Sequence, residues 1–309
     1  MLRFAAIRLA QFPLILGVIY LVTFALAWVA PGSPFEDEGR VDRATVERLK
    51  RDFRADHPAS FLAYYPARLL TRGDFGPSMQ YPEWSVNEIL RNSLPVSVTL
   101  GLFALTVAVL VGVGVGTLAA VHRGGPLDTA SLGITLVGIS LPSFVTASLL
   151  LLLFSVRWPL FPIGTWGSPR DLVLPGVALS LMPMAYIARL TRVAMIDTLG
   201  NDYVRTARAK GLSRTVVVWR HCLRNAFLPV LSYLGPAAAA TLTGSFVVEK
   251  VFNVNGLGQY FVDSVRNRDQ TLILGTVMVY SVFVLGFNLL VDLAYGLVDP
   301  RIDVTASGV

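Results

Sequence analysis

Long apolar stretches dominate the pattern of the chain. Six of them are long enough to cross the hydrocarbon core of a bilayer, which is about 30 Å thick. They lie near residues 9–31, 94–121, 129–156, 172–196, 227–250 and 272–298. Because a backbone in lipid must satisfy its own hydrogen bonds, each stretch predicts a helix. The pattern therefore predicts an all-α integral membrane protein with six transmembrane helices.

The composition agrees with this pattern. Hydrophobic residues make up 54% and charged residues 15% of the 309 residues, and the mean hydropathy is +0.60. A soluble domain has about 25% charged residues. The bilayer is therefore the first solvent to consider for this chain.

The first apolar stretch has two interpretations. Arg3 and Arg8 precede it and it ends in Ala27–Ala30, a pattern that also fits a cleaved secretory signal. The apolar part is longer than the core of a signal peptide, however, and Pro31 would directly follow the cut. We expect a retained membrane anchor.

The placement of charge predicts the orientation. One segment between the fourth and fifth stretches holds eight basic residues (Arg189, Arg192, Arg205, Arg208, Lys210, Arg214, Arg220 and Arg224) and two acidic ones (Asp197 and Asp202). This excess equals the net charge of +6 of the whole chain, so the charge does not indicate a nucleic-acid partner. Loops rich in Lys and Arg face the cytoplasm, which places both termini inside and residues 32–93 outside.

The outer segment 32–93 is the part that looks soluble. Residues 42–53 predict a short amphipathic helix, and a second helix is expected after Pro58. The second helix is indicated by apolar residues at helical spacing: Phe61, Leu62, Tyr65 and Leu69. Glycine and proline predict a loop over 73–77. We expect a small extracytoplasmic cap.

Small residues and prolines mark the predicted membrane helices. The candidates for a transport pathway or for close helix packing are Gly112, Gly114, Gly116, Pro142, Pro183, Gly244 and Ser245. The glycines and the serine allow helices to approach closely, whether or not they also line a pore. The prolines interrupt backbone hydrogen bonding, which produces either a static bend or a point where a path opens.

No pattern of catalytic or metal-binding residues is present in the sequence. The phosphate-binding loop with its lysine is missing, and so are the zinc-protease and serine-hydrolase motifs. Cys222 is the single cysteine, and the three histidines lie far apart in sequence. Asp292 is the candidate for an ionisable group in a span, which gives little support to proton or sodium coupling. We expect neither a catalytic residue nor a bound cofactor.

The basic inner loop predicts a short helix between two turns. Gly200 ends the preceding helix, Asn201 or Asp202 caps a new one, and residues 203–210 form two turns. Gly211 suits a left-handed position, and Ser213 caps the return segment. The helix either rests on anionic lipid or docks, through a side that includes Tyr203, Ala207 and Lys210, into a soluble motor protein. The residues alone leave both interpretations open.

A family resemblance favours the docking interpretation. The sequence over 202–212, followed by Arg224–Pro229, resembles the cytoplasmic signature loop of ABC-type importer permeases. Ala207, Gly211 and the pair Leu228 and Pro229 fall on the family pattern, whereas Arg205 and Thr206 replace its Glu and Ala, as in the peptide-importing branch. The resemblance implies that the helix that couples to the ATPase comprises Asp202, Tyr203, Val204, Arg205, Thr206, Ala207, Arg208, Lys210, Gly211 and Leu212.

The resemblance extends over nearly the whole chain. Segments 30–35, 73–78, 141–144, 255–259, 267–269 and 299–302 look like those of the B-type permease of oligopeptide and dipeptide importers, the first two most like the oligopeptide member. It implies the six-helix fold of type I ABC importer permeases, with an N-terminal helix over 1–31, a cap over 32–93 and a core over 94–298. The core would include the coupling loop 197–226, and a cytoplasmic tail would cover 299–309.

The resemblance also implies partners and a mechanism. The permease would pair with a second, related permease, two ATPase subunits that bind ATP and Mg²⁺, and an extracytoplasmic peptide-binding protein. Together they would import peptides by alternating access across the cytoplasmic membrane of a bacterium or archaeon. Nickel chelates and glutathione remain alternative cargoes. A self-sufficient secondary transporter lacks a clear coupling site, and an intramembrane protease lacks a paired nucleophile and base.

Overall fold

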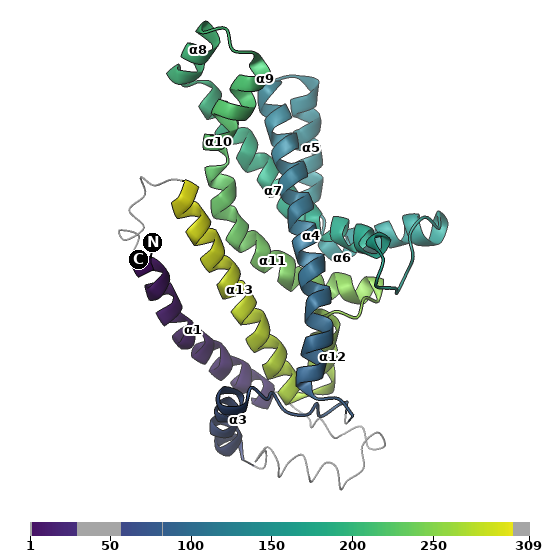
Figure 1. The fold of residues 1–309 in the computed structure, drawn as a ribbon. Coiled ribbons are helices and arrows are strands. Elements are labelled where there is room, and N and C mark those ends of the chain that lie inside the picture. The colour runs from purple at the N-terminus through teal and green to yellow at the C-terminus, as the bar shows by residue number, and fades with distance from the viewer. Residues whose placement is uncertain (1, 30–56, 82, 299–309) are drawn as a thin grey trace. The chain divides into compact units, whose positions relative to one another are not determined.

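The structure is a computed structural model that describes residues 2–29, 57–81 and 83–298. The described chain is almost entirely helical (Figure 1). Its elements are α1 (Leu2–Val29), α3 (Pro58–Arg72), α4 (Val86–Val121), α5 (Pro126–Ser140), α6 (Ser143–Leu151), the π-helix η1 (Leu152–Arg157), α7 (Pro169–Leu199), α8 (Asp202–Ala209), α9 (Arg214–Val216), the π-helix η2 (Val217–Cys222), α10 (Leu223–Ala226), α11 (Leu228–Phe252), α12 (Leu257–Asn267) and α13 (Gln270–Val298). The predicted helix over 42–53 and the segments 30–35 and 299–302 lie outside the described residues.

The described residues of all six predicted membrane stretches fall on helices, apart from the break at residues 141–142 and Phe227 directly before α11. Four single helices, α1, α4, α7 and α13, are long and apolar enough to cross a membrane. The other two stretches are bent pairs, α5 with α6 and η1, and the two halves of α11. The predicted six crossings therefore match the structure if each bent pair crosses once.

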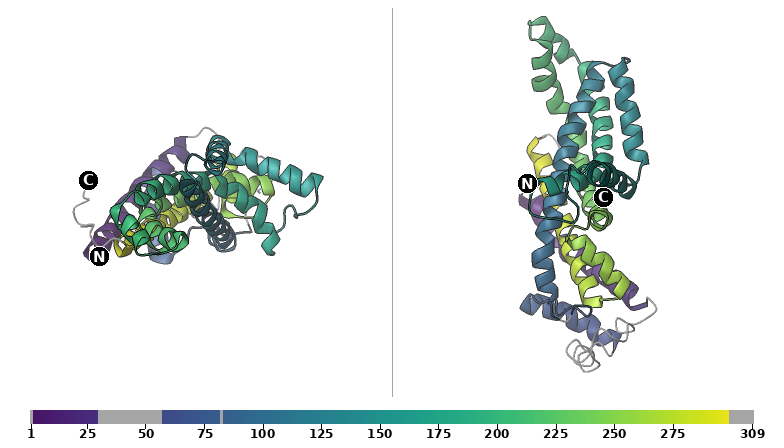
Figure 2. Two further views of the ribbon diagram at one scale, coloured as in Figure 1. Left: turned by 90° about the horizontal axis from the view of Figure 1, so that it is seen from above. Right: turned by 90° about the vertical axis from the view of Figure 1, so that its right-hand side faces the viewer.

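The third predicted span, over 129–156, is not one straight helix, and it bends at Pro142, one of the two prolines expected to interrupt a membrane helix. Its two parts meet at an angle of 102° (Figure 1, Figure 2). Leu141 and Pro142 both have extended backbone conformations there, with ψ values of 122° and 143°. Proline lacks an N–H and pushes the residue before it out of the helical region, which explains the break. Pro183, by contrast, lies buried within the continuous α7.

The chain forms two compact units, each made from segments distant in sequence. One contains residues 99–254 and the end of α13 from Gly286, together with the start of α1. The other contains the described parts of 7–98 and residues 255–285. The sequence-based division at 31, 93 and 298 stays a prediction.

An aromatic cluster forms the centre of the second unit. Phe61 and Tyr65 of α3 are buried against Tyr20 of α1, whose ring stacks on Tyr65 at 6.2 Å between centroids. The Tyr20 hydroxyl donates to the carbonyl of Leu62 at 3.0 Å, and that of Tyr65 donates to the carbonyl of Thr271 at 3.2 Å. The helix predicted after Pro58 is thus confirmed, and the two buried tyrosines meet hydrogen-bond acceptors.

The loop after α3 is fixed by two carboxylates. Asp74 accepts hydrogen bonds from Arg68 at 2.9 and 2.5 Å and from the Gly76 N–H at 2.8 Å. Although burial raises it, the pKa of Asp74 stays below its ordinary value because of these bonds and the arginine charge. The buried Asp269 accepts from the Ser78 hydroxyl and from the Gln80 N–H. The predicted loop over 73–77 is confirmed, and it is held to the turn before α13.

Glycines let α4 and α7 approach closely in the first unit. A Cβ on Gly112 would lie 2.8 Å from the Met184 carbonyl oxygen of α7, and one on Gly116 would overlap the Ala188 carbonyl. Gly114, between them, has nothing within 4 Å of such an atom. Gly112 and Gly116 therefore act in helix packing, as small residues do where helix backbones meet.

We expect Gly116→Ala to destabilise the α4–α7 contact, because the new methyl group has no space against a backbone carbonyl. Overpacking of this kind lowers the free energy of unfolding by about 1–3 kcal/mol. Thermal unfolding of the purified protein in detergent measures the effect. Gly114→Ala is the matched control and should leave the midpoint unchanged or raise it slightly. Equal losses in both variants would contradict the packing assignment.

Candidate functional site

The candidate site is the hairpin over residues 197–226, which projects from the end of α7. α7 ends at Leu199, and Asn201 takes the extended N-cap conformation, with ψ of 150°. Asp202 lies in the first turn of α8, where the helix dipole favours a negative charge. The predicted two-turn helix is confirmed over 202–209.

A glycine turn reverses the chain after α8. Gly211 has a φ of +80°, the left-handed conformation that the sequence predicted. The Ser213 hydroxyl accepts a hydrogen bond from the Val216 N–H at 3.4 Å, so the predicted cap is also present. The return segment runs through η2 and α10 to α11, which begins at Leu228 with Pro229 in its first turn.

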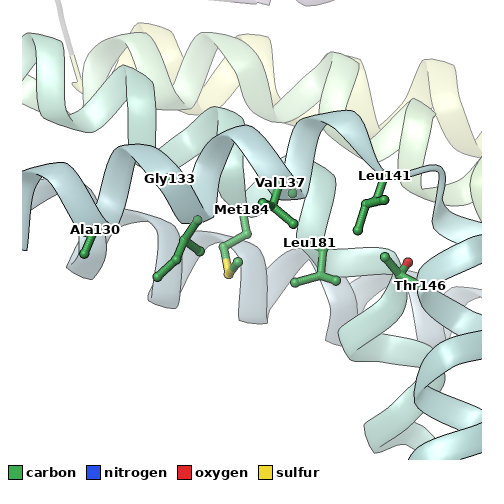
Figure 3. A pocket seen from close by; sticks show the side chains of 9 residues that line it. Ala130, Gly133, Val137, Leu141, Thr146, Leu181 and Met184 are labelled. Carbon is green, nitrogen blue, oxygen red and sulfur yellow. The ribbon is translucent and has the colours of Figure 1, made fainter.

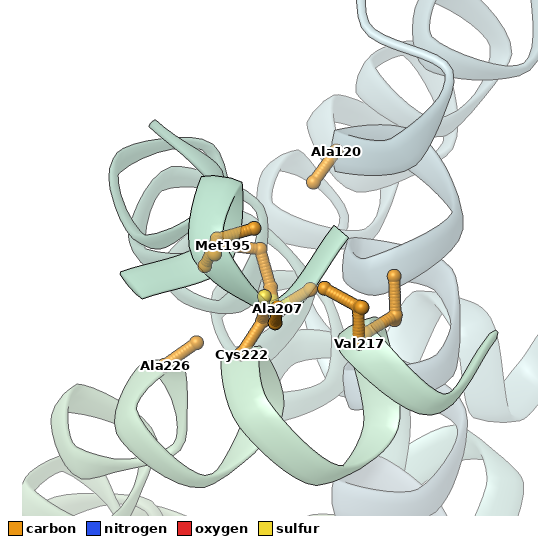
Figure 4. Packing of buried hydrophobic residues seen from close by; sticks show 8 residues of the cluster. Ala120, Met195, Ala207, Val217, Cys222 and Ala226 are labelled. Atoms are coloured by element: carbon orange, nitrogen blue, oxygen red, sulfur yellow. The ribbon is translucent and has the colours of Figure 1, made fainter. Parts of the chain in front are cut away.

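An apolar core fixes α8 to the rest of the hairpin (Figure 4). Val204 and Ala207, one turn apart on α8, are both buried in it. Their neighbours come from α4, α7, η2 and α10: Ala120, Met195, Val217, Val218, Cys222 and Ala226. Burial also raises the pKa of the Cys222 thiol above its ordinary value.

This core corrects one detail of the sequence prediction. Ala207 was expected on the docking side with Tyr203 and Lys210, but it faces the protein's own interior. Spacing of three to four residues puts Ala207 on the same helix face as the apolar Val204, which needs burial. Ala207 thus stabilises α8 by packing in the apolar core of the hairpin.

The rest of the α8 surface is exposed and mostly polar, with two arginines. The exposed residues of α8 are Asp202, Tyr203, Arg205, Thr206, Arg208 and Ala209, and the turn adds Lys210, Gly211 and Leu212. Arg205 and Asp202 lie 3.5 Å apart, but with side chains 77% and 96% exposed they stabilise the helix little. The Tyr203 hydroxyl accepts a hydrogen bond from the Asn225 side-chain amide at 3.0 Å, which ties the two arms of the hairpin together.

Polar contacts join the hairpin to the end of α4, and α7 to α5. The Arg214 guanidinium donates to the carbonyl of Val121, the last residue of α4, at 2.6 Å. Arg192 of α7 donates to both carboxylate oxygens of Asp128 in the first turn of α5, at 2.5 and 2.8 Å. The sequence alone does not indicate this pair, because its partners are 64 residues apart.

The distribution of ionisable groups also differs from the sequence prediction. Asp292 was expected to be the one ionisable residue within the membrane spans. In the structure, Glu249 also lies fully buried in α11, and Arg192 lies within α7. Asp292 itself is partly exposed. Among the residues that the structure describes, no group of three or more His, Cys, Asp or Glu side chains could hold a metal ion.

An apolar groove lies between α5, α6 and α7 (Figure 3). Its volume is about 410 Å³, and its lining residues are Ala130, Gly133, Ile134, Val137, Gly138, Leu141, Thr146, Leu181 and Met184. None of the glycines, prolines or serine predicted for the pathway lines it. The lining of the groove includes Leu141, which directly precedes Pro142, and Met184, which directly follows Pro183. Two of the predicted pathway residues, both prolines, therefore lie next to the groove in sequence.

Comparisons with known proteins agree with this arrangement. Residues 112–304, more than half of the chain, match the family model described as "Binding-protein-dependent transport system inner membrane component". The chain belongs to this family. It is a multi-pass permease, the transmembrane subunit of a transport system that also uses ATPase and substrate-binding subunits, and it is not itself the ATPase.

Two relatives illustrate how far the similarity of this permease extends. The dipeptide transport system permease protein of Bacillus subtilis (strain 168) is 46% identical over 291 residues, 94% of each chain. The oligopeptide transport system permease protein of Escherichia coli (strain K12) is 38% identical over 304 residues, 98% of this permease and 99% of the relative. The resemblance to B-type permeases is confirmed.

A solved structure supports the fold. A chain in the "Crystal structure of an amino acid ABC transporter with histidines" aligns with a TM-score of 0.52 at 20% identity. The alignment covers 68% of this permease and 94% of that chain. The all-helical fold of an ABC transporter permease is thereby confirmed.

We expect Ala207→Arg to open the hairpin, because it places a charge inside the apolar core. The local stability should fall by at least about 2 kcal/mol. Limited proteolysis of the purified permease measures this as faster cleavage between residues 205 and 214. Thr206→Arg adds the same side chain on the exposed side and should leave the cleavage rate near that of the parent. Equal rates for the two variants would contradict the burial of Ala207.

Proposed function

We propose that this permease imports short peptides, together with a second, related permease, two ATPase subunits and an extracytoplasmic peptide-binding protein. The support for peptide cargo is the similarity to a dipeptide permease and an oligopeptide permease over nearly the full chain. The two identities do not separate the cargoes, so the proposal covers both lengths of peptide. ATP and Mg²⁺ would bind to the partner ATPase subunits.

The observation that carries this proposal is the two-sided build of α8. One side is buried in the hairpin core, and the rest of the surface presents two arginines and the exposed ring of Tyr203, with Leu212 exposed in the turn that follows. A helix that only rested on lipid would not need a hairpin core beneath it. A rigid helix with an exposed face suits a groove on a protein that moves, and the partner would be the ATPase.

The hairpin would face the cytoplasm. Its excess of basic residues over acidic ones supports this, since inner loops carry the Lys and Arg of membrane proteins. Both termini would then lie inside, and the segment 32–93 would form the extracytoplasmic cap. The division into an anchor over 1–31, a core over 94–298 and a tail over 299–309 belongs to the same proposal.

Transport would proceed by alternating access. Closure of the ATPase dimer would displace α8, and the core helices would open outward to receive peptide from the binding protein. The break at Pro142 offers a joint for that movement, and the apolar groove beside it carries no fixed charge that would select peptide side chains. Gly244 and Ser245 remain pathway candidates, with Ser245 buried and bonded to the Leu242 carbonyl at 2.6 Å.

The proposal is tested by a pair of substitutions at Gly211. Asp and Asn have nearly the same size and both tolerate a positive φ, so they strain the turn equally. Only Gly211→Asp adds a negative charge to the basic docking face, and we expect it to lower ATP-dependent peptide uptake by about tenfold, or about 1.4 kcal/mol. Gly211→Asn should keep most of the activity.

Uptake is measured in proteoliposomes that contain all the partner subunits. Copurification of the ATPase with each variant separates loss of docking from loss of membrane insertion. Normal uptake and normal ATPase copurification in Gly211→Asp would contradict the docking role of α8.

A further inference from the structure

The ion pair between Asp128 and Arg192 has the geometry of a fixed clamp. Arg192 donates through Nε to one carboxylate oxygen and through Nη2 to the other, at 2.5 and 2.8 Å. The Asp128 side chain is 5% exposed and that of Arg192 is 21% exposed. A bidentate, largely buried pair defines both distance and orientation, unlike the exposed pair on α8.

The ion pair is one of several contacts among the hairpin and the neighbouring ends of α4, α5 and α7. Asp128 also accepts from the Gly124 N–H at 2.9 Å, in the turn that joins α4 to α5. Arg214 of the hairpin holds the end of α4 at Val121. Arg192 lies one turn before Met195, which is part of the core beneath α8. The ends of α4, α5 and α7 are therefore connected to the hairpin by side chains as well as by the chain itself.

Between its two ends, α5 packs on α7, and its buried residues include Ser131, Thr135 and Gly138. An added Cβ on Gly138 would be 3.1 Å from the Ala185 methyl carbon, and the apolar groove opens beside this contact. α5 then ends at the break before Pro142, where the chain turns by 102°. One end of α5 is thus held by the Asp128–Arg192 pair, and its other end lies at the break before Pro142.

We propose that Asp128 and Arg192 are a positioning pair that makes α5 follow α7 when the ATPase displaces α8. The pair transmits that displacement along α5 to the break at Leu141 and Pro142, where the pathway opens. This inference rests on the proposed function of the hairpin. Neither residue contacts the ATPase or the peptide in this scheme; both act through the helices that they join.

The test measures coupling rather than activity alone. The complete transporter is reconstituted in proteoliposomes, and peptide uptake and ATP hydrolysis are measured in the same preparation. Asp128→Asn keeps the shape of the side chain but removes its charge, so α5 no longer follows α7 firmly. We expect ATP hydrolysis to continue while uptake per ATP falls at least about fivefold, the lower end of typical coupling effects.

Two further variants extend the test. The exchange Asp128→Arg with Arg192→Asp restores opposite charges and should recover part of the uptake per ATP. Asp74→Asn removes the carboxylate charge from a pair of the same composition, with Arg68 and a glycine N–H as its donors. We expect this control to lower the thermal midpoint without changing uptake per ATP. Unchanged uptake per ATP in Asp128→Asn would overturn the proposal.

If Asp128→Asn does not assemble with its partners, Arg192→Lys takes its place. Lysine keeps the charge but cannot bind both oxygens in one plane, so a lowered ratio supports the proposal and a normal ratio overturns it. Gly211→Asp distinguishes this inference from the function beneath it. A normal Gly211→Asp transporter means that the docking role has failed. A defective one, together with normal coupling in the pair variants, means that only the positioning role has failed.

Discussion

The burial of one side of α8 in the hairpin core is the interaction on which the rest of the structure depends. An isolated helix of eight residues would be unstable in water, because helices shorter than about 12 residues rarely gain enough from their own hydrogen bonds. Val204 and Ala207 supply the missing stabilisation by packing against Met195, Val218 and Cys222. With its apolar side satisfied, the helix holds its basic side in one fixed position.

The helices around α8 are connected to one another by specific contacts. Arg214 holds the end of α4, the Asp128–Arg192 pair joins α5 to α7, and Gly112 and Gly116 bring α4 against α7. A displacement of the hairpin therefore has rigid neighbours to act on. In the proposed mechanism, the resulting movement would be concentrated at the proline break after α5, beside an apolar groove.

Local signals in the sequence predicted the helices and turns well. The apolar stretches, the αL turn at Gly211, the cap at Ser213 and the helix after Pro58 all depend on residues close together in the chain, and each is confirmed. The sequence did not predict the angle at Pro142, the inward side of Ala207 or the Asp128–Arg192 pair. The pair depends on which distant helix lies opposite, and a single sequence does not contain that information directly. The bend and the face of Ala207 follow from local features, proline at 142 and the spacing from Val204, but those features did not define the angle or exclude an outward Ala207.

The most direct test of the account compares two adjacent positions on α8 in the assembled transporter. Single cysteines replace Thr206 or Ala207 in a Cys222→Ala background, and a short thiol crosslinker is added during ATP turnover. The account predicts that the exposed position 206 crosslinks to the ATPase subunit, whereas the buried position 207 does not. Failure of position 206 to reach the ATPase, or equal crosslinking from position 207, would contradict it.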